Sequence, residues 1–247
     1  MPSKPVNLNN GRVFARQGDA EKHFLAIRDR HPLNTPIADA DDIDDLLSLL
    51  ERYDALIHDG PSKIGVGVLH FETRLNYTNG GSNVGFWVVR TDNSETDFSL
   101  FKAVSGRGTP VNLQFHEACR SAVGEALGEA KRGFFAEHAD ADDTIPCEAM
   151  GVRIKLSETR VDYVVSSFKD IVHAFRRTRG WTDEFPDGVI TQPGDAQTIT
   201  TFVDPVVAAA FRKYHDACAQ VRLVSKSATA ADLRQGATLP PKRPLRL

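Results

Sequence analysis

Chemically capable side chains gather in the segment "IPCEAMGVRIKLSETRVDYVVSSF", residues 145–168. The pattern predicts a short strand from Cys147, a turn at Gly151 and a returning strand that ends at Asp162 and Tyr163, just before a helix. The Asp162 carboxylate is a hard oxygen ligand that suits Mg²⁺ or Mn²⁺. An unperturbed phenol has a pKa of about 10, so Tyr163 is mostly protonated at neutral pH and is a poor general base. The same carboxylate could instead cap the following helix, and both interpretations stay open.

Two histidines further along the chain could supply what the phenol lacks. His173 lies on the predicted helix "SFKDIVHAFRRTRG", and His215 lies in "KYHDA" on the last predicted helix. Either could serve as a substitute base or metal ligand, although a lone histidine on a helix is more often a surface or a satisfied core residue. The cysteines lack CxxC spacing, which excludes a readable zinc knuckle or disulfide framework. Cys119 and Cys218 fall at apolar helical positions and are expected in the core.

The end of the helix that contains His173 is strongly basic. The sequence "FRRTRGW" places Arg176, Arg177 and Arg179 beside Trp181. Arginines next to an aromatic ring are typical of a patch that contacts phosphates and stacks on bases. Cations in the last turn also complement the helix dipole, so a purely structural role is the alternative.

Further cations lie outside this helix. Lys242, Arg243 and Arg246 in the tail could add non-specific attraction to phosphate. Lys63 and Arg90 in the first half could point toward a ligand, or could serve as edge-strand charges that prevent strand pairing.

Composition sets limits on the class of protein. The chain has 247 residues, 41% of them hydrophobic and 26% charged, with a net charge of −3. This balance is ordinary for a globular protein and argues against an evenly basic, histone-like nucleic-acid binder, but not against a local basic groove. We find no signal peptide and no apolar run of membrane-spanning length, so a reduced, cytoplasmic protein without membrane contact is expected.

The first half changes from helical to strand periodicity. A helix is predicted over "AEKHFLAIRDRH", with Asp19 as its cap and Ala20, Phe24 and Ile27 on one face. A second helix follows over "ADADDIDDLLSLLERYDALIHDG", and its acidic start is expected to be a solvated turn that complements the helix dipole. The segments "KIGVGVLHF", "VGFWVVR" and "TDFSLFKAV" predict three strands of an antiparallel meander.

The second half is mainly helical. A long helix is predicted over "NLQFHEACRSAVGEALGEAKRGFFAEH", followed by the hairpin and the helix described above. Asp204 and Pro205 supply a cap and a first-turn proline for the last helix, which is expected to run through "VVAAAFRKYHDACAQVRLVS".

The first half resembles the DCL family, named for a plant protein required for chloroplast and leaf development. The resemblance runs from about Gly11 to Val104 and is carried by "HFLAIRD", "PSKIGVGVLHF" and "FWVVRTDNSETDFSLFKAV". Family members are associated with processing of organelle ribosomal RNA, and a similar domain lies in the tail of a plant RNA polymerase subunit. The resemblance implies a DNA or RNA partner and does not imply catalysis in this half.

The second half resembles the divergent HNH-type (ββα-metal) nuclease region that accompanies such a domain in bacterial proteins. The similar stretches are "FHEACRSAV", "IPCEAMG", "RVDYVVSSF" and "FRKYHDACAQVRLVSKSATAADL". The resemblance implies a divalent-metal site with Asp162 as ligand. It also places Tyr163 where the family has its histidine base and Thr229 where the family has an asparagine. Losing a general base lowers the rate by about 10²–10⁴-fold, so catalysis is expected to be impaired.

Together these patterns predict an α+β protein in three parts. Residues 1–106 form a DCL-like domain of helices and an antiparallel meander, residues 107–235 a mainly helical HNH-like region with a ββα-type hairpin and helix, and residues 236–247 a flexible basic tail. Three functions follow. The first is a nucleic-acid-binding protein with an impaired nuclease region and no cofactor. The second is an active Mg²⁺- or Mn²⁺-dependent endonuclease that uses Asp162 with His173 or His215. The third is a module that binds protein, such as RNA polymerase or a phage protein.

Overall fold

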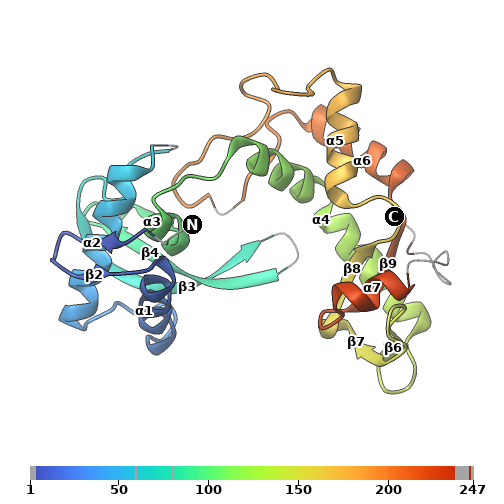
Figure 1. Cartoon of the computed structure of the whole chain (residues 1–247), viewed down its shortest axis with the longest axis horizontal. Coiled ribbons are helices and arrows are strands. Elements are labelled where there is room, and N and C mark those ends of the chain that lie inside the picture. Colours follow the sequence, from blue (N-terminus) through green and yellow to red (C-terminus); the bar gives the residue numbers. More distant parts are fainter. Residues whose placement is uncertain (1–3, 59, 79–80, 198, 237–244, 246–247) are drawn as a thin grey trace. The chain divides into compact units, whose positions relative to one another are not determined.

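A computed structural model describes residues 4–58, 60–78, 81–197, 199–236 and 245 (Figure 1). These residues form a mixed α/β structure of helices and small antiparallel sheets. They divide into two compact units, one from the ranges 1–114 and 191–200 and the other from 115–190 and 201–247. Within the described ranges, no helix combines the length and the apolar character that crossing a membrane requires.

The first unit contains two helices, a three-stranded sheet and a short third helix. Its elements are β1 (Val6–Asn7), β2 (Val13–Phe14), α1 (Gln17–Arg30), α2 (Ala40–Leu56), β3 (Val68–Thr78), β4 (Gly81–Arg90), β5 (Glu95–Phe98) and α3 (Leu100–Ser105). The strands β3, β4 and β5 pair antiparallel in that order, as the predicted meander requires.

One face of the β3–β4–β5 sheet is covered by helices. Phe71, Phe86 and Phe98 lie in a core with Phe24 of α1 and Leu46 of α2. Side chains alternate between the faces of a strand, so Glu72, Arg74 and Trp87 lie on the other face. The predicted apolar face of α1 is confirmed, because Ala20, Phe24 and Ile27 are fully buried.

Two local predictions for the first unit were wrong. The third strand ends at Phe98, because the Ser99 side chain accepts a hydrogen bond from the Lys102 N–H and begins α3. The helix α1 begins at Gln17, so Asp19 lies in its first turn and does not cap it. Both errors concern an element boundary, which depends on which of several polar side chains captures the free N–H groups.

The second unit combines helices with two separate strand pairs. Its elements are most of α4 (Val111–His138), β6 (Thr144–Pro146), β7 (Arg153–Lys155), a 3-10 turn (Leu156–Glu158), β8 (Thr159–Tyr163), α5 (Phe168–Thr178), α6 (Pro205–Cys218), β9 (Val221–Ser225) and α7 (Ala230–Gly236). The Asp204 side chain caps α6, and Pro205 occupies its first turn, as predicted.

The hairpin predicted between Cys147 and Tyr163 is correct in its turn and wrong in its second strand. The turn is closed by the Gly151 N–H, which donates to the Cys147 carbonyl at 2.8 Å, and β6 pairs with β7. The strand β8, which ends at Tyr163, pairs instead with β9, with Tyr163 opposite Val221. A partner so distant in sequence leaves no signal in the local pattern.

The end of the second unit also differs from the prediction. The helix α6 stops at Cys218, and "VRLVS" forms the fully buried strand β9. Its β-branched residues suit a strand, although the helical period of α6 continues up to it. Cys218 is therefore exposed rather than in the core, whereas Cys119 is buried as predicted.

Most of the predicted tail lies outside the described residues, including Lys242, Arg243 and Arg246. Leu245 is described and is buried, and its N–H donates to the Val221 carbonyl at 3.3 Å.

Candidate functional site

The strand pair β8–β9 presents two faces with different chemistry. Asp162 lies opposite Arg222, and Tyr163 lies opposite Val221. Because neighbouring side chains of a strand point to opposite faces, Asp162 and Tyr163 point away from each other. One face carries the Tyr163 ring, which packs against Phe168 and His215, and the other carries the Asp162 carboxylate, which meets Arg222.

Tyr163 is bound to His215 inside the core. The phenol oxygen lies 2.9 Å from His215 Nε2, and His215 is fully buried. The carboxylate of Asp216 lies 3.2 Å from His215 Nδ1 and can only accept a proton there. In the neutral ring, Nε2 therefore accepts from the Tyr163 hydroxyl. Burial raises the pKa of Tyr163 to about 12, so this phenol is a weaker acid than a free one and stays protonated at neutral pH, where it cannot act as a general base.

Asp162 is bound to an arginine rather than being available to a cation. Its Oδ2 accepts from Arg222 Nε at 2.8 Å, and the side chains of Arg222 and Asp162 are 3% and 15% exposed. Arg222 also donates to the Leu233 carbonyl in α7 at 3.0 Å. A buried guanidinium needs a counter-charge, and its own positive charge repels a divalent cation. Asp162 does not cap α5 either, since Ser167 and Asp170 form that capping box.

Thr229 has a structural partner as well. Its backbone N–H and its hydroxyl both donate to Asp232 Oδ2 at 2.7 Å, and the Asp232 N–H returns a bond to the Thr229 hydroxyl at 3.3 Å. This reciprocal pair caps α7. The Thr229 hydroxyl, expected from the sequence to replace an asparagine of the site, is thus engaged in holding a helix end.

The residues present do not fit the expected Mg²⁺ or Mn²⁺ site. Among the residues that the structure describes, no three His, Cys, Asp or Glu side chains lie close enough together to hold a metal ion. Asp162 faces Arg222, and His215 lies with Tyr163 on the opposite face. Cys147 is buried, and its sulfur accepts the Ser225 N–H at 3.2 Å.

His173 meets a histidine that the sequence reasoning missed. The rings of His173 on α5 and His116 on α4 have centroids 5.6 Å apart. Arg120, one turn after His116, places its guanidinium 4.7 Å from the centre of the Phe168 ring. Lys169 lies one turn before His173.

This cluster had a signal in the sequence. The pairs His116 with Arg120 and Lys169 with His173 each have a spacing of four, which places both members on one face of a helix. The two pairs come together because α4 packs against α5 through a shared core that contains Phe115, Cys119 and Ile171. The sequence does not show this packing.

Of the predicted arginine patch, Arg176 is a structural residue. It is 3% exposed, and it donates to the carbonyls of Trp181 at 2.8 Å and Asp183 at 3.0 Å. These bonds order the loop after α5, so Arg176 is not available to phosphate. Arg177 and Arg179 are exposed.

Trp181 belongs to the same packed region rather than to an open stacking platform. It is partly buried and lies edge-on to Phe115 and Phe175. The Arg179 guanidinium lies 5.4 Å from the centre of the Trp181 ring. Of the four residues in the predicted patch, Arg177 and Arg179 keep exposed cationic groups.

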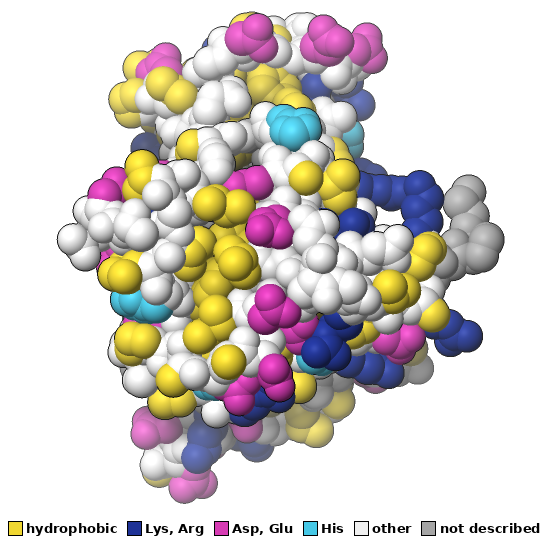
Figure 2. All heavy atoms as spheres, turned by 90° about the vertical axis from the view of Figure 1, so that its left-hand side faces the viewer, with side chains coloured by type: hydrophobic (Ala, Val, Ile, Leu, Met, Phe, Trp, Pro, Cys, Tyr) yellow, Lys and Arg dark blue, Asp and Glu magenta, His cyan; other side chains and the backbone are white. Residues whose placement is uncertain are grey.

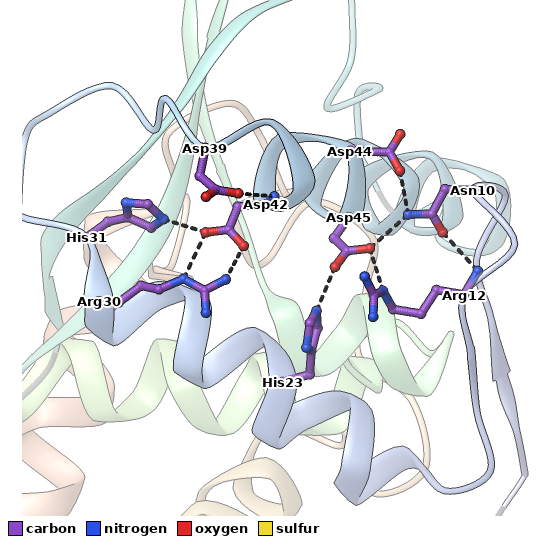
Figure 3. A network of polar contacts seen from close by, with 9 residues as sticks. All are labelled: Asn10, Arg12, His23, Arg30, His31, Asp39, Asp42, Asp44 and Asp45. Atoms are coloured by element: carbon purple, nitrogen blue, oxygen red, sulfur yellow. Dashed lines mark hydrogen bonds and ion pairs between the residues drawn. The ribbon is translucent and has the colours of Figure 1, made fainter.

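The first unit holds a polar network that the sequence did not reveal (Figure 3). Asp42 was expected in a solvated turn, but it is 2% exposed. Its carboxylate accepts from Arg30 Nε at 2.8 Å and lies 2.7 Å from His31 Nε2. Burial alone would raise the pKa of Asp42, but the hydrogen bonds from Arg30 and His31 outweigh burial and hold it below its usual value.

Asp45, one turn along α2, repeats this arrangement. It is 2% exposed and binds Arg12 Nε at 2.7 Å, His23 Nε2 at 2.7 Å and Asn10 Nδ2 at 2.8 Å. Against the effect of burial, these bonds keep the pKa of Asp45 below its usual value. The two carboxylates therefore join α2 to α1 and to the N-terminal segment (Figure 3).

Lys63 and Arg90 also have partners inside the first unit. They therefore neither point toward a ligand nor serve as edge-strand charges, as the sequence had predicted. Lys63 is buried and donates from Nζ to the Thr96 hydroxyl at 2.9 Å. Arg90 is buried and forms two bonds of 2.9 Å to the carboxylate of Asp195. Neither side chain is presented to a ligand.

Comparisons with known proteins give a family of unknown function. A family model described as "Protein of unknown function (DUF3223)" matches residues 25–104. The chain is similar to an uncharacterized protein from Rhodospirillum rubrum, solved by solution NMR, with 33% identity over 41% of this chain and 88% of that chain and a TM-score of 0.33. No curated protein matches the chain.

Proposed function

We propose that this protein binds nucleic acid and that its second unit is an HNH-like nuclease region that has lost efficient catalysis. One observation carries the proposal. Tyr163 and Asp162 are tied to His215 and Arg222, while Arg120 on α4 and Lys169 on α5 are exposed cations. The phosphate backbone dominates affinity for nucleic acid, so exposed cations are the relevant groups.

The loss of catalysis follows from the partners of two residues. The resemblance assigns the base position to Tyr163, but its raised pKa keeps the proton on the phenol, which donates it to the hydrogen bond with His215. It assigns the metal position to Asp162, which Arg222 already neutralises. A missing base alone costs about 10²–10⁴-fold in rate.

Binding is supported by the surface beside that centre. Arg120 and Lys169 are exposed, as are Arg177 and Arg179 at the end of α5. By contrast, the face on the side of α1 and α2 mixes acidic, basic and hydrophobic side chains (Figure 2). Phosphate contacts are therefore assigned to the second unit.

A protein partner is the second candidate, and the first unit favours it. Val13, Val66, Leu69 and Phe101 of that unit are exposed hydrophobic residues. Under the DCL-like interpretation, this unit would contact a protein such as RNA polymerase or a phage protein, while the second unit would hold the nucleic acid.

The binding test compares two charge-matched double variants. We expect Arg120→Gln with Lys169→Gln to weaken binding of a labelled DNA or RNA strand, measured by fluorescence anisotropy across salt concentrations. On a single strand each phosphate contact contributes about 0.7 to the magnitude of the slope of log K against log salt, so this magnitude should fall by about 1.4 when the two contacts are lost. Arg16→Gln with Lys22→Gln removes two exposed cations from the first unit and serves as control. Equal losses in both variants would contradict the assignment.

The catalytic test uses the same strands with Mg²⁺ or Mn²⁺. We expect the unmodified protein to bind without cutting, and we expect a Tyr163→His, Thr229→Asn variant to cut no faster, because Arg222 still occupies the Asp162 carboxylate. The Asp162→Asn variant keeps an amide oxygen that can accept the hydrogen bond from Arg222. It measures the background level of strand cleavage. Robust cleavage by the unmodified protein that Asp162→Asn abolishes would end the proposal of lost catalysis.

A further inference from the structure

The histidine pair of the second unit lies among cations. His116 is partly buried, His173 is exposed, and their rings meet at an interplanar angle of 70°. Arg120 follows His116 by one turn of α4, and Lys169 precedes His173 by one turn of α5. The two imidazoles are in ring contact, and Arg120 and Lys169 lie close enough to His116 for their charges to lower its pKa.

Both helices contribute cations that surround His116. Burial lowers the pKa of His116, and the positive charges of His173, Arg120, Lys169 and Arg176 lower it further. A neutral histidine surrounded by cations gains a proton readily once an anion arrives.

The acidic groups near the pair offset part of this charge. Asp170 on α5 is bound to the Ser167 hydroxyl at 2.6 Å, as part of the capping box, and the charges of His173 and Lys169 lower its pKa. Glu117 is next to His116 in sequence, and Arg177 adds a further cation one turn after His173. From β8, the group near Arg120 is the Tyr163 phenol, whose raised pKa keeps it uncharged.

We infer that His116, His173, Arg120 and Lys169 form a binding site for a phosphodiester group of nucleic acid, and that this site binds more tightly as the pH falls. The inference rests on the proposed function and names the phosphate contact of the same surface. Phosphate oxygens can accept from all four side chains, and bonds to charged donors are the strong ones. A metal ion would instead face the repulsion of Arg120 and Lys169.

The direction of the pH effect follows from linkage. A bound phosphate raises the pKa of both imidazoles, so binding takes up protons. The affinity then rises about tenfold per pH unit for each proton taken up, over the range between the free and the bound pKa values. For imidazoles this range lies around and below about pH 7. At higher pH only Arg120 and Lys169 contribute.

The test measures binding of a short labelled single strand, one of DNA and one of RNA, between about pH 5.5 and about pH 8 at constant ionic strength. We expect the affinity of the full chain to rise at least about tenfold across this range. His116→Gln with His173→Gln should remove the pH dependence, while His58→Gln, an exposed histidine of the first unit, should keep it. Arg120→Gln with Lys169→Gln should weaken binding at every pH and leave the change of affinity with pH as it is in the unmodified protein.

A second measurement reads the site directly. NMR titration of the histidine rings with dimethyl phosphate should raise the pKa of His116 and His173 and leave His58 unchanged. Unchanged pKa values, or a response of both rings to Zn²⁺ in place of phosphate, would overturn the inference.

The outcomes separate this inference from the proposed function. Nucleic-acid binding that is independent of pH and intact in the His116→Gln, His173→Gln variant overturns the histidine site and leaves the proposed function in place. Absence of binding at every pH overturns both.

Discussion

In the first unit, the buried carboxylates of Asp42 and Asp45 are each met by an arginine and a histidine of the same unit. In the second unit, Asp162 is met by Arg222, but His116 lies beside His173 and the cations Arg120 and Lys169, whose charges lower its pKa. A buried charge whose partner is removed destabilises the fold, whereas exposed cations that lie close together repel each other until a ligand of opposite sign binds. The difference separates residues that serve structure from residues available to a partner.

The largest effect is expected at Asp162, and it shows whether this carboxylate stabilises the fold through Arg222. Asp162→Ala leaves Arg222, 3% exposed, without its counter-charge, and should lower the free energy of unfolding by about 3–5 kcal/mol. The chain has two tryptophans, so a Trp87→Phe background lets Trp181 report on the second unit in urea denaturation. The exposed Asp187→Ala should change stability by less than about 0.5 kcal/mol. An unchanged or raised stability for Asp162→Ala would contradict a structural role and would leave Asp162 as a candidate ligand-binding residue.

A smaller loss is expected in the first unit. Asp42→Asn should cost about 1–3 kcal/mol at neutral pH, because Arg30 is 51% exposed and can regain water. A Trp181→Phe background leaves Trp87 as the reporter of this unit. The exposed Asp41→Asn is the matched control.

The pH dependence of the same variant has a defined sign. The folded-state pKa of Asp42 is lowered, so its contribution is present above the unfolded pKa of about 3.9 and is lost as the pH falls through the folded value. The unmodified protein should therefore lose stability below about pH 4 more steeply than Asp42→Asn does. Parallel acid profiles would show that Asp42 is not matched as described.

The smallest effect concerns Thr229. Thr229→Ala removes the cap of α7 and should cost about 1 kcal/mol, whereas Thr229→Asn, an equally good cap, should stay within a few tenths. Urea denaturation followed at Trp181 measures both. Equal losses of stability in the two variants would mean that the Thr229 hydroxyl does not cap α7 and would argue against its structural role.

The sequence predicted elements better than partners. The apolar stripe of α1 and the capping of α6 by Asp204 depend on residues within a few turns, and both were correct. The pairing of β8 with β9 joins residues 60 positions apart, and nothing in either strand specifies the other.

The same limit applies to the candidate site. Asp42 has the local pattern of an exposed helix start, and only the distant Arg30 and His31 make its burial tolerable. His173 was identified alone, because His116 lies on another helix. Arg176 was placed with Arg177 and Arg179, although its contacts to Trp181 and Asp183 depend on how the loop folds back.

The long separation between β8 and β9 also bears on synthesis. Residues 159–163 leave the ribosome well before residues 221–225, and until then Asp162 has no guanidinium opposite it. Arg90 likewise waits for Asp195. Both units therefore reach their final charge pairing late in translation, and nascent chains stalled before residue 195 should be cleaved by added protease more readily than chains extended past residue 225.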